Sequence, residues 1–259
     1  MNSIRIKDAE DLAKMRIAGQ LLARVFVMLD DVVREGVTTM EINQRVEDYI
    51  VNDLQARPAS KGQYDYPYVL NCSVNEVVCH GMPKASEKLR SGSIVNLDIT
   101  LEKNGFIADS SKMYMIGEVS SVARRLVKTT YEAMWAGIRQ VRPGARLGDI
   151  GHTIQRHAES AGYSVVREYC GHGIGRQMHE EPQVLHYGKA GTGVTLTEGM
   201  VFTIEPMINQ GDHRVKTLKD GWTVVTRDKK LSAQWEHTVA VTRDGFEVLT
   251  LRPEEQRIH

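Results

Sequence analysis

The sequence predicts an α+β protein built from two similar halves. Apolar residues recur at three- and four-residue steps in two separate parts of the chain, which is typical of amphipathic helices. Each of these parts is followed by segments with the period of strands. Short stretches of the first half also align with stretches of the second half, which indicates an internal repeat.

The first helical part covers residues 8–34, where leucine, valine and methionine alternate with charged residues at helical spacing. Gly36 marks its end, because glycine readily adopts the left-handed conformation that terminates helices. Thr38 or Thr39 is placed to cap a second helix, which we expect to run to about Asp53.

Residues 57–71 lose the helical period and contain prolines and three tyrosines, so we expect a loop there. From Ser91 the period changes to that of strands, and two strands are expected around a turn at residues 102–105. The rest of the chain is expected to contain two more helices and then strands and turns, at residues 120–141, 147–161 and onwards to Leu251.

The repeat is seen in two pairs of segments that occur in the same order at nearly the same offset. Residues 36–42 align with 144–150, each after an amphipathic helix, and residues 92–98 align with 199–205. One weak match would be little evidence, but two matches in the same order and at nearly the same offset favour a pseudo-twofold molecule. We therefore expect one domain over residues 1–259, with halves at about 8–117 and 120–251.

Composition excludes several classes of protein. The 259 residues carry 33 basic and 33 acidic side chains, so no general attraction to nucleic acid or to an anionic membrane is expected. Three cysteines without a CxxC pair argue against a disulfide framework or a thiolate zinc site. The charged N-terminus and the lack of a long apolar run predict a soluble, cytoplasmic protein.

Two aspartates are placed to face each other across the predicted hairpin. Asp98 ends an apolar run, where a turn-starting aspartate is the ordinary interpretation. If the turn centres on residues 103–104, Asp98 lies opposite Asp109; if it centres on residues 104–105, the two are diagonal neighbours. Side chains alternate with period two, so either register puts both carboxylates on one face of the sheet.

Two glutamates repeat this arrangement in the second half of the chain. Glu205 follows the apolar run of the aligned segment, and Glu236 lies in another apolar segment. Like charges that face each other in a sheet are destabilising unless a cation lies between them. The four acids therefore predict a bound cation.

Three histidines lie beside these acids, at the ends of apolar or glycine-rich segments: His80, His172 and His179. A single histidine is more often an ordinary polar residue than a metal ligand, but three of them next to four acids reverse that preference. Oxygen ligands with one imidazole suit Mn²⁺, Co²⁺, Fe²⁺ or Zn²⁺. Four carboxylates balance two divalent ions, so a two-metal hydrolase is the natural class.

These residues, in this order, resemble the type I methionine aminopeptidases in their short bacterial form. The resemblance implies the pita-bread fold, with a pseudo-twofold of two αβ halves, a central antiparallel sheet and helices on its outer face. No zinc-finger or ribosome-docking extension is expected before Ile4. The segments that carry the likeness extend over almost the whole chain: NEVVCHG (75–81), IVNLDITLEKNGFIADSSKM (94–113), EYCGHGIGRQMHEEPQVLHY (168–187), MVFTIEPM (200–207) and KDGWTVVTRDKKLSAQWEHTVAVT (219–242).

The resemblance also implies a role for each matching residue. Two divalent ions would be held by five ligands, of which Asp109 and Glu236 bridge the pair: Asp98, Asp109, His172, Glu205 and Glu236. A hydroxide between the ions would attack the peptide bond, with Glu205 taking the proton. His179 would stabilise the oxyanion, and His80 would bind the amide nitrogen of the second residue. Some members bind Na⁺ or K⁺ at positions that match Asn75, Val77 and Ser232.

The methionine pocket is where the sequence departs from the family pattern. Aromatic or apolar pocket positions match Tyr66 and Trp222, for which an ordinary core role is the alternative. Other positions differ from the usual residue: Gln63 stands near a usual tyrosine, Met178 where phenylalanine is common, and Ser60 and Asn71 where some members carry cysteine. Met178 suits a thioether-lined slot. Gln63 makes the pocket more polar, so a weaker preference for methionine or a lower rate is expected.

The expected activity is removal of the initiator methionine from nascent polypeptides by a monomer that contacts the ribosome transiently and requires neither nucleic acid nor a membrane. Two alternatives stay open. A proline-specific aminopeptidase or prolidase uses the same ligand types, although such chains usually carry a further N-terminal domain. A catalytically silent binding module would be expected to lose one or more ligands, and this sequence keeps all five.

Overall fold

The computed structural model describes residues 3–256, so residues 1–2 and 257–259 of the predicted domain lie outside the described residues. Its long helices match the predicted ones closely: α1 (Ala9–Val32), α2 (Thr39–Asp48), α3 (Ser121–Ile138) and α4 (Leu147–Ser160). Asp8 caps α1 by accepting a hydrogen bond from the Asp11 amide. Thr38, not Thr39, caps α2, and the helix continues as a π-helical turn at Tyr49–Asp53.

The strands form antiparallel sheets. A four-stranded sheet belongs to the first half, and its strands are β1 (Arg57–Pro58), β2 (Leu70–Val74), β4 (Ile94–Lys103) and β5 (Phe106–Met115). A five-stranded sheet of the second half runs in the order β15 (Gly245–Val248), β14 (His237–Thr242), β9 (Val201–Ile204), β7 (Gly171–Gly173), β8 (Glu180–Val184). The predicted loop at 57–71 contains β1 and a 3-10 turn at Gln63–Asp65.

Two small sheets complete the fold. One runs in the order β13 (Ser232–Gln234), β10 (Met207–Asn209), β6 (Ser164–Val165). The other runs in the order β11 (Val215–Thr217), β12 (Val224–Thr226), β3 (Val77–Cys79). The mixed α/β class with antiparallel sheets is therefore confirmed.

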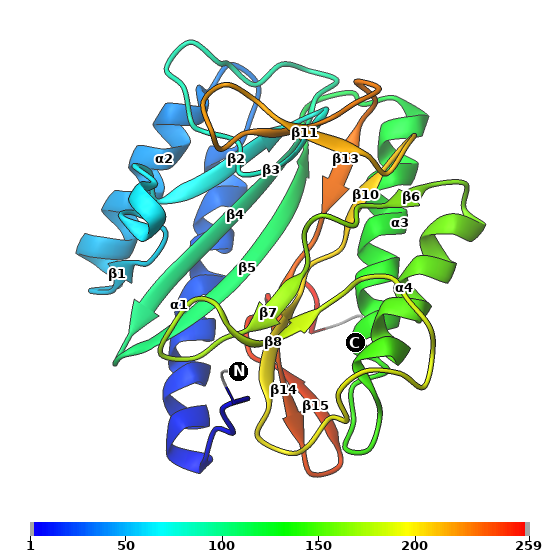
Figure 1. Cartoon of the computed structure of the whole chain (residues 1–259). Helices are drawn as coiled ribbons and strands as arrows, with labels where there is room; N and C mark the ends of the chain where they lie inside the picture. Colours follow the sequence, from blue (N-terminus) through cyan, green and yellow to red (C-terminus); the bar gives the residue numbers. More distant parts are fainter. Residues whose placement is uncertain (1–2, 257–259) are drawn as a thin grey trace.

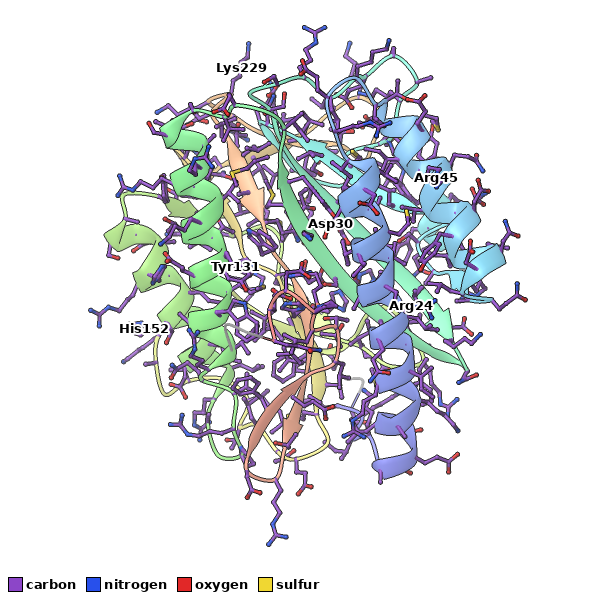
Figure 2. All side chains as sticks on the ribbon, turned by 180° about the vertical axis from the view of Figure 1, so that it is seen from behind. Arg24, Asp30, Arg45, Tyr131, His152 and Lys229 are labelled. Carbon is purple, nitrogen blue, oxygen red and sulfur yellow. The ribbon has the colours of Figure 1, made fainter. Side chains whose placement is uncertain are left out.

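The long helices cover one side of the strands (Figure 1). Seen from behind, α1 and α3 lie in front of the strands, with Asp30 and Tyr131 on these two helices (Figure 2). Two large apolar cores result. One packs α1 and α2 on β2, β4 and β5, and the other packs α3 and α4 on the strands of the second half.

The first aligned pair of segments, residues 36–42 and 144–150, has the same local geometry in both halves. Gly36 and Gly144 both have a positive φ, of 89° and 86°, just before the cap of α2 or α4. The residues two positions later form equivalent isolated bridges, Thr38 with Lys88 and Arg146 with Thr195. In one respect the prediction was wrong: Asp98 lies in the middle of β4 rather than at its end, because the Asn104–Gly105 turn lets that strand continue to Lys103.

Helix α1 packs closely against the C-terminal part of the chain at Gly19. A Cβ on Gly19 would lie 2.1 Å from the Leu249 carbonyl oxygen. We therefore expect Gly19→Ala to destabilise the protein by about 1–3 kcal/mol, although alanine is the better helix former. Urea unfolding would measure this, with the exposed neighbour Gln20→Ala as a control that changes the free energy of unfolding by less than about 0.5 kcal/mol.

None of the helices within residues 3–256 is both long enough and apolar enough to cross a membrane.

Candidate metal centre

The β4–β5 hairpin fixes the positions of the two aspartates. Its turn is Asn104–Gly105, with φ values of 56° and 78°, as a two-residue hairpin turn of this sequence requires. Asp98 is therefore paired with Ser111, and Asp109 with Thr100. The two aspartates are diagonal neighbours on one face, which is the second of the two predicted registers.

The second half supplies the other three ligand candidates. His172 lies on β7, Glu205 follows the last residue of β9, and Glu236 lies between β13 and β14. Glu236 forms an isolated bridge with Ser111, and Ser110 Oγ donates a hydrogen bond of 2.7 Å to its carbonyl oxygen. These contacts hold the strand of Asp109 directly against the strand of Glu236.

All five ligand candidates line one cavity of about 770 Å³. Ligand atoms of Asp109, His172 and Glu236 all lie within 4.8 Å of one another. His172 Nε2 is 3.5 Å from Glu205 Oε1 and 3.8 Å from Asp109 Oδ2. The structure thus brings together the predicted acids and His172.

The carboxyl groups of this cluster have raised pKa values, which favour a bound cation. Burial raises the pKa of Asp98 to about 6 and that of Glu205 to about 8. Burial, together with the neighbouring carboxylates, raises the pKa values of Asp109 and Glu236 well above their usual range. Asp109 Oδ1 is also buried without a hydrogen-bond partner in the described part of the chain. A divalent ion would satisfy the oxygen and neutralise the charge, so the residues fit a metal centre.

His172 has the protonation state and the tautomer that a metal ligand requires. Burial lowers its pKa to about 3, which keeps the imidazole neutral at ordinary pH. Its Nδ1 lies 3.1 Å from the Gly173 carbonyl oxygen, which can only accept a hydrogen bond. We therefore assign the proton to Nδ1, which leaves the Nε2 lone pair directed at the carboxylates.

Sequence reasoning missed Thr203 and Gln234, which hold Glu205 in place, and it assigned Asn71 to the methionine pocket without its contact to Asp98. Thr203 Oγ1 donates to Glu205 Oε1 at 2.7 Å, and Gln234 Nε2 donates to Glu205 Oε2 at 3.3 Å. Asn71 Nδ2 donates to Asp98 Oδ2 at 3.1 Å across the β2–β4 ladder, in which the two residues are directly paired. Thr203 could have been found, because it lies two positions before Glu205 in a strand and so shares its face.

The other two histidines line the same cavity. The ring of His179 lies edge-on to His172, with centroids 4.4 Å apart, and stacks with Tyr64 at 5.8 Å. Tyr64 Oη is 3.3 Å from His179 Nδ1. His80 packs edge-on against Tyr169 at 5.4 Å. Tyr64 was not predicted, because nothing in the sequence of this loop distinguishes it from its neighbours.

The predicted pocket residues are grouped beside the acids. Tyr66 contacts Trp222 edge-on, with ring centroids 4.9 Å apart. All of the residues assigned to the methionine pocket line the cavity: Ser60, Gln63, Tyr66, Asn71, Met178 and Trp222. The positions expected to bind a monovalent cation do not line it. The Ser232 amide donates to the Asn75 carbonyl oxygen at 2.9 Å, and Val77 pairs with Val225.

The comparisons with known proteins agree with this geometry. The model of metallopeptidase family M24 matches residues 13–243. The methionine aminopeptidase of Salmonella typhimurium is 52% identical over 253 residues, which cover 98% of this chain and 96% of the relative. The crystal structure of methionine aminopeptidase from Rickettsia prowazekii superposes with a TM-score of 0.94 at 49% identity, over 96% of this chain and 100% of that one.

More distant structures share the fold alone. Prolidase from Pyrococcus furiosus superposes with a TM-score of 0.76 at 21% identity, over 95% of this chain and 65% of that one. The family match over most of the chain and the high identity to full-length relatives lead to the same assignment. The chain belongs to metallopeptidase family M24.

Proposed function

We propose that this protein is a methionine aminopeptidase, which removes the N-terminal methionine from polypeptides in a metal-dependent reaction. The observation that carries the proposal is the buried group of four carboxylates and one neutral imidazole around a single cavity, in a chain 52% identical to a methionine aminopeptidase. Four acids can hold two divalent ions, and the ligand types suit Co²⁺, Mn²⁺, Fe²⁺ or Zn²⁺.

The family resemblance implies the role of each ligand. Asp109 and Glu236 would contribute to both ions, and their ligand atoms lie within 4.8 Å of each other. Asp98 would hold one ion, and His172 with Glu205 would hold the other. Bound divalent ions would supply a nucleophile at neutral pH and polarise the scissile carbonyl. We also propose a Na⁺ or K⁺ site at Asn75, Val77 and Ser232.

The protein's own groups carry the proton transfers. Glu205 would accept the proton of the attacking water, and its hydrogen bonds from Thr203 and Gln234 orient the carboxylate for that purpose. Tyr64 Oη is placed to donate to His179 Nδ1, which leaves Nε2–H of His179 to stabilise the oxyanion. His80 would hydrogen-bond the amide nitrogen of the second residue and help to protonate the leaving amine.

The remaining expectations are part of the same proposal. Tyr66, Trp222, Met178 and Gln63 would bind the first side chain. The enzyme would act as one domain, as a monomer in the cytoplasm, on nascent chains and with transient contact to the ribosome. The family resemblance supports these points, and the supply of ligands by both halves of the chain supports the single domain.

The reaction is tested with Met-Ala-Ser, Leu-Ala-Ser and Ala-Pro-Ala tripeptides after chelation and after return of each metal. We expect metal-dependent release of methionine alone. Cleavage of Ala-Pro-Ala would assign the protein to the proline-specific branch that shares its fold. Failure to cleave any of them, from folded and metal-loaded protein, would leave a binding module as the better explanation.

Asn71 is expected to influence metal binding at Asp98. Removing its amide in Asn71→Ala should weaken metal affinity about 10–100-fold, because groups that orient a ligand typically contribute that much. Calorimetric titration with Mn²⁺ would measure the effect. Asn52→Ala, on the exposed π-helical turn, is the matched control. An unchanged affinity in Asn71→Ala would show that the hydrogen bond does not orient Asp98.

A further inference from the structure

The lining of the cavity includes several hydrogen-bond donors beside the candidate metal centre. We call this part the first-residue slot: Ser60, Gln63, Asn71 and Thr100 form what we name its polar wall, and Tyr66, Cys79 and Trp222 line the same cavity. The polar wall is assembled by strand pairing. Asn71 is paired with Asp98, and Thr100 lies two residues further along β4, so both point to the face of Asp98.

The polar wall keeps several donors that the protein does not use. Asn71 donates one of its two side-chain N–H groups to Asp98. Ser60 Oγ and Thr100 Oγ1 bond to each other at 2.5 Å, which uses one hydroxyl hydrogen and leaves the other. Among the described residues, the side-chain amide of Gln63 has no hydrogen-bond partner. The slot therefore presents a surplus of N–H and O–H groups beside the candidate metal centre.

A methionine side chain cannot satisfy these donors, because its thioether sulfur is only a weak acceptor. Burying a donor without a partner costs free energy. A side chain with a strong acceptor at the same position therefore binds more favourably than methionine. Methionine sulfoxide has the same chain as methionine and adds one such acceptor oxygen. The Tyr66 and Trp222 rings, which contact each other edge-on in the same cavity, still offer an apolar surface to the methylene groups.

On this basis we propose that the protein also removes an N-terminal methionine sulfoxide, with Ser60, Gln63 and Asn71 as the residues that determine this specificity. The inference rests on the proposed function, because it places the first side chain of the substrate in this slot. Hydrolysis adds water across the peptide bond, with the hydroxyl going to the carbonyl carbon and a proton going to the leaving amine. The sulfoxide is unchanged, so the step requires no reductant or oxidant.

The polar wall is chiral, and so is the sulfoxide sulfur. The two epimers direct the oxygen to different sides of the side chain, so a chiral lining cannot offer its donors equally to both. We therefore expect one epimer to be preferred at least five-fold, which is about the effect of one neutral hydrogen bond.

The test compares kcat/KM for Met-Ala-Ser, for the two epimers of the sulfoxide peptide and for norleucine-Ala-Ser, which has no acceptor. We expect the better epimer to be cleaved within about thirty-fold of the methionine peptide. Gln63→Leu should lower the sulfoxide-to-methionine ratio at least five-fold, while the norleucine-to-methionine ratio changes less than two-fold. Lys61→Leu lies in the same loop but outside the cavity and should leave both ratios unchanged.

Two results would overturn the inference while the proposed function stands. One is ready cleavage of Met-Ala-Ser with both epimers more than about thirty-fold slower, and the other is a sulfoxide-to-methionine ratio that Gln63→Leu does not alter. If folded, metal-loaded protein cleaves none of the peptides, the proposed function fails and the inference falls with it. Cleavage of a sulfoxide peptide without cleavage of Met-Ala-Ser would support the proposed specificity of the slot, but it would overturn the proposal that methionine is the substrate.

Discussion

Asp109→Asn will lower kcat/KM for a methionine tripeptide by at least about 10³-fold, because under the proposed assignment this carboxylate is shared by the two ions and contributes several kcal/mol. One ligand atom each of Asp109, His172 and Glu236 lies within 4.8 Å of the others. An amide cannot bridge two cations as an anion does. Metal content after dialysis should fall together with the activity.

The same change should stabilise the metal-free protein, by about 1 kcal/mol, because it removes one acid from a buried group of like charges. Chemical unfolding in the presence of a chelator measures this gain, and Asp244→Asn, in an exposed turn, serves as the control. Full metal retention and activity in Asp109→Asn would contradict the assignment of this residue as a bridging ligand.

Arg252→Met is expected to cost about 3–5 kcal/mol of stability, because it removes the permanent positive charge beside the buried carboxylate of Glu255, which His237 contacts as well. Arg252 is fully buried, and its Nη2 donates to Glu255 Oε1 at 2.9 Å. Its Nη1 donates to Ser110 Oγ and to the Ser111 carbonyl oxygen, both at 3.3 Å. The guanidinium also lies over the rings of Phe26 and Trp235, at 5.4 Å from each.

A second substitution separates this cause from lost packing. In Arg252→Met/Glu255→Gln the carboxylate charge is gone as well, so part of the loss should be recovered. Arg16→Met breaks the partly exposed pair with Glu247 and should cost less than about 1 kcal/mol. Equal losses in the single and double variants would show that packing of the guanidinium, rather than its charge, stabilises this region.

The pH dependence of stability follows from the same contacts. Burial alone would raise the pKa of Glu255, but His237 and Arg252 together lower it below its ordinary value of 4.5. A carboxyl group with a lowered pKa stabilises the folded state above its unfolded pKa and loses that contribution as the pH falls through its folded pKa. The stability difference between the wild type and Arg252→Met should therefore shrink below about pH 4.5.

The sequence was sufficient where a residue acts through its neighbours in the chain. Alternation along the strands placed Asp98 and Asp109 on one face in either of two registers, and the structure has the one whose turn is Asn104–Gly105. The cap of α2 was likewise predicted to within a residue, because a cap depends on side chains three positions apart.

Contacts between distant segments could not be predicted in this way. Asn71 meets Asp98 only because β2 pairs with β4 in one particular register, and no local pattern sets that register. Tyr64 reaches His179 from a loop whose backbone takes an uncommon conformation, with a φ of 50°. Arg252 is buried by contacts with Phe26 and Ser110, which are far from it in the sequence, so no local pattern predicts them.

The contact between β5 and Glu236 has a consequence for the order in which the protein folds. The β4–β5 hairpin closes over two residues and can form early, since short loops close fastest. The hydrogen bond from Ser110 to the Glu236 carbonyl joins residues that are 126 positions apart in the sequence. Because such a long loop is expected to close late, we expect Asp109 and Glu236 to meet only near the end of folding. Tight uptake of metal should then follow the rate-limiting folding step and could serve as a probe for its completion.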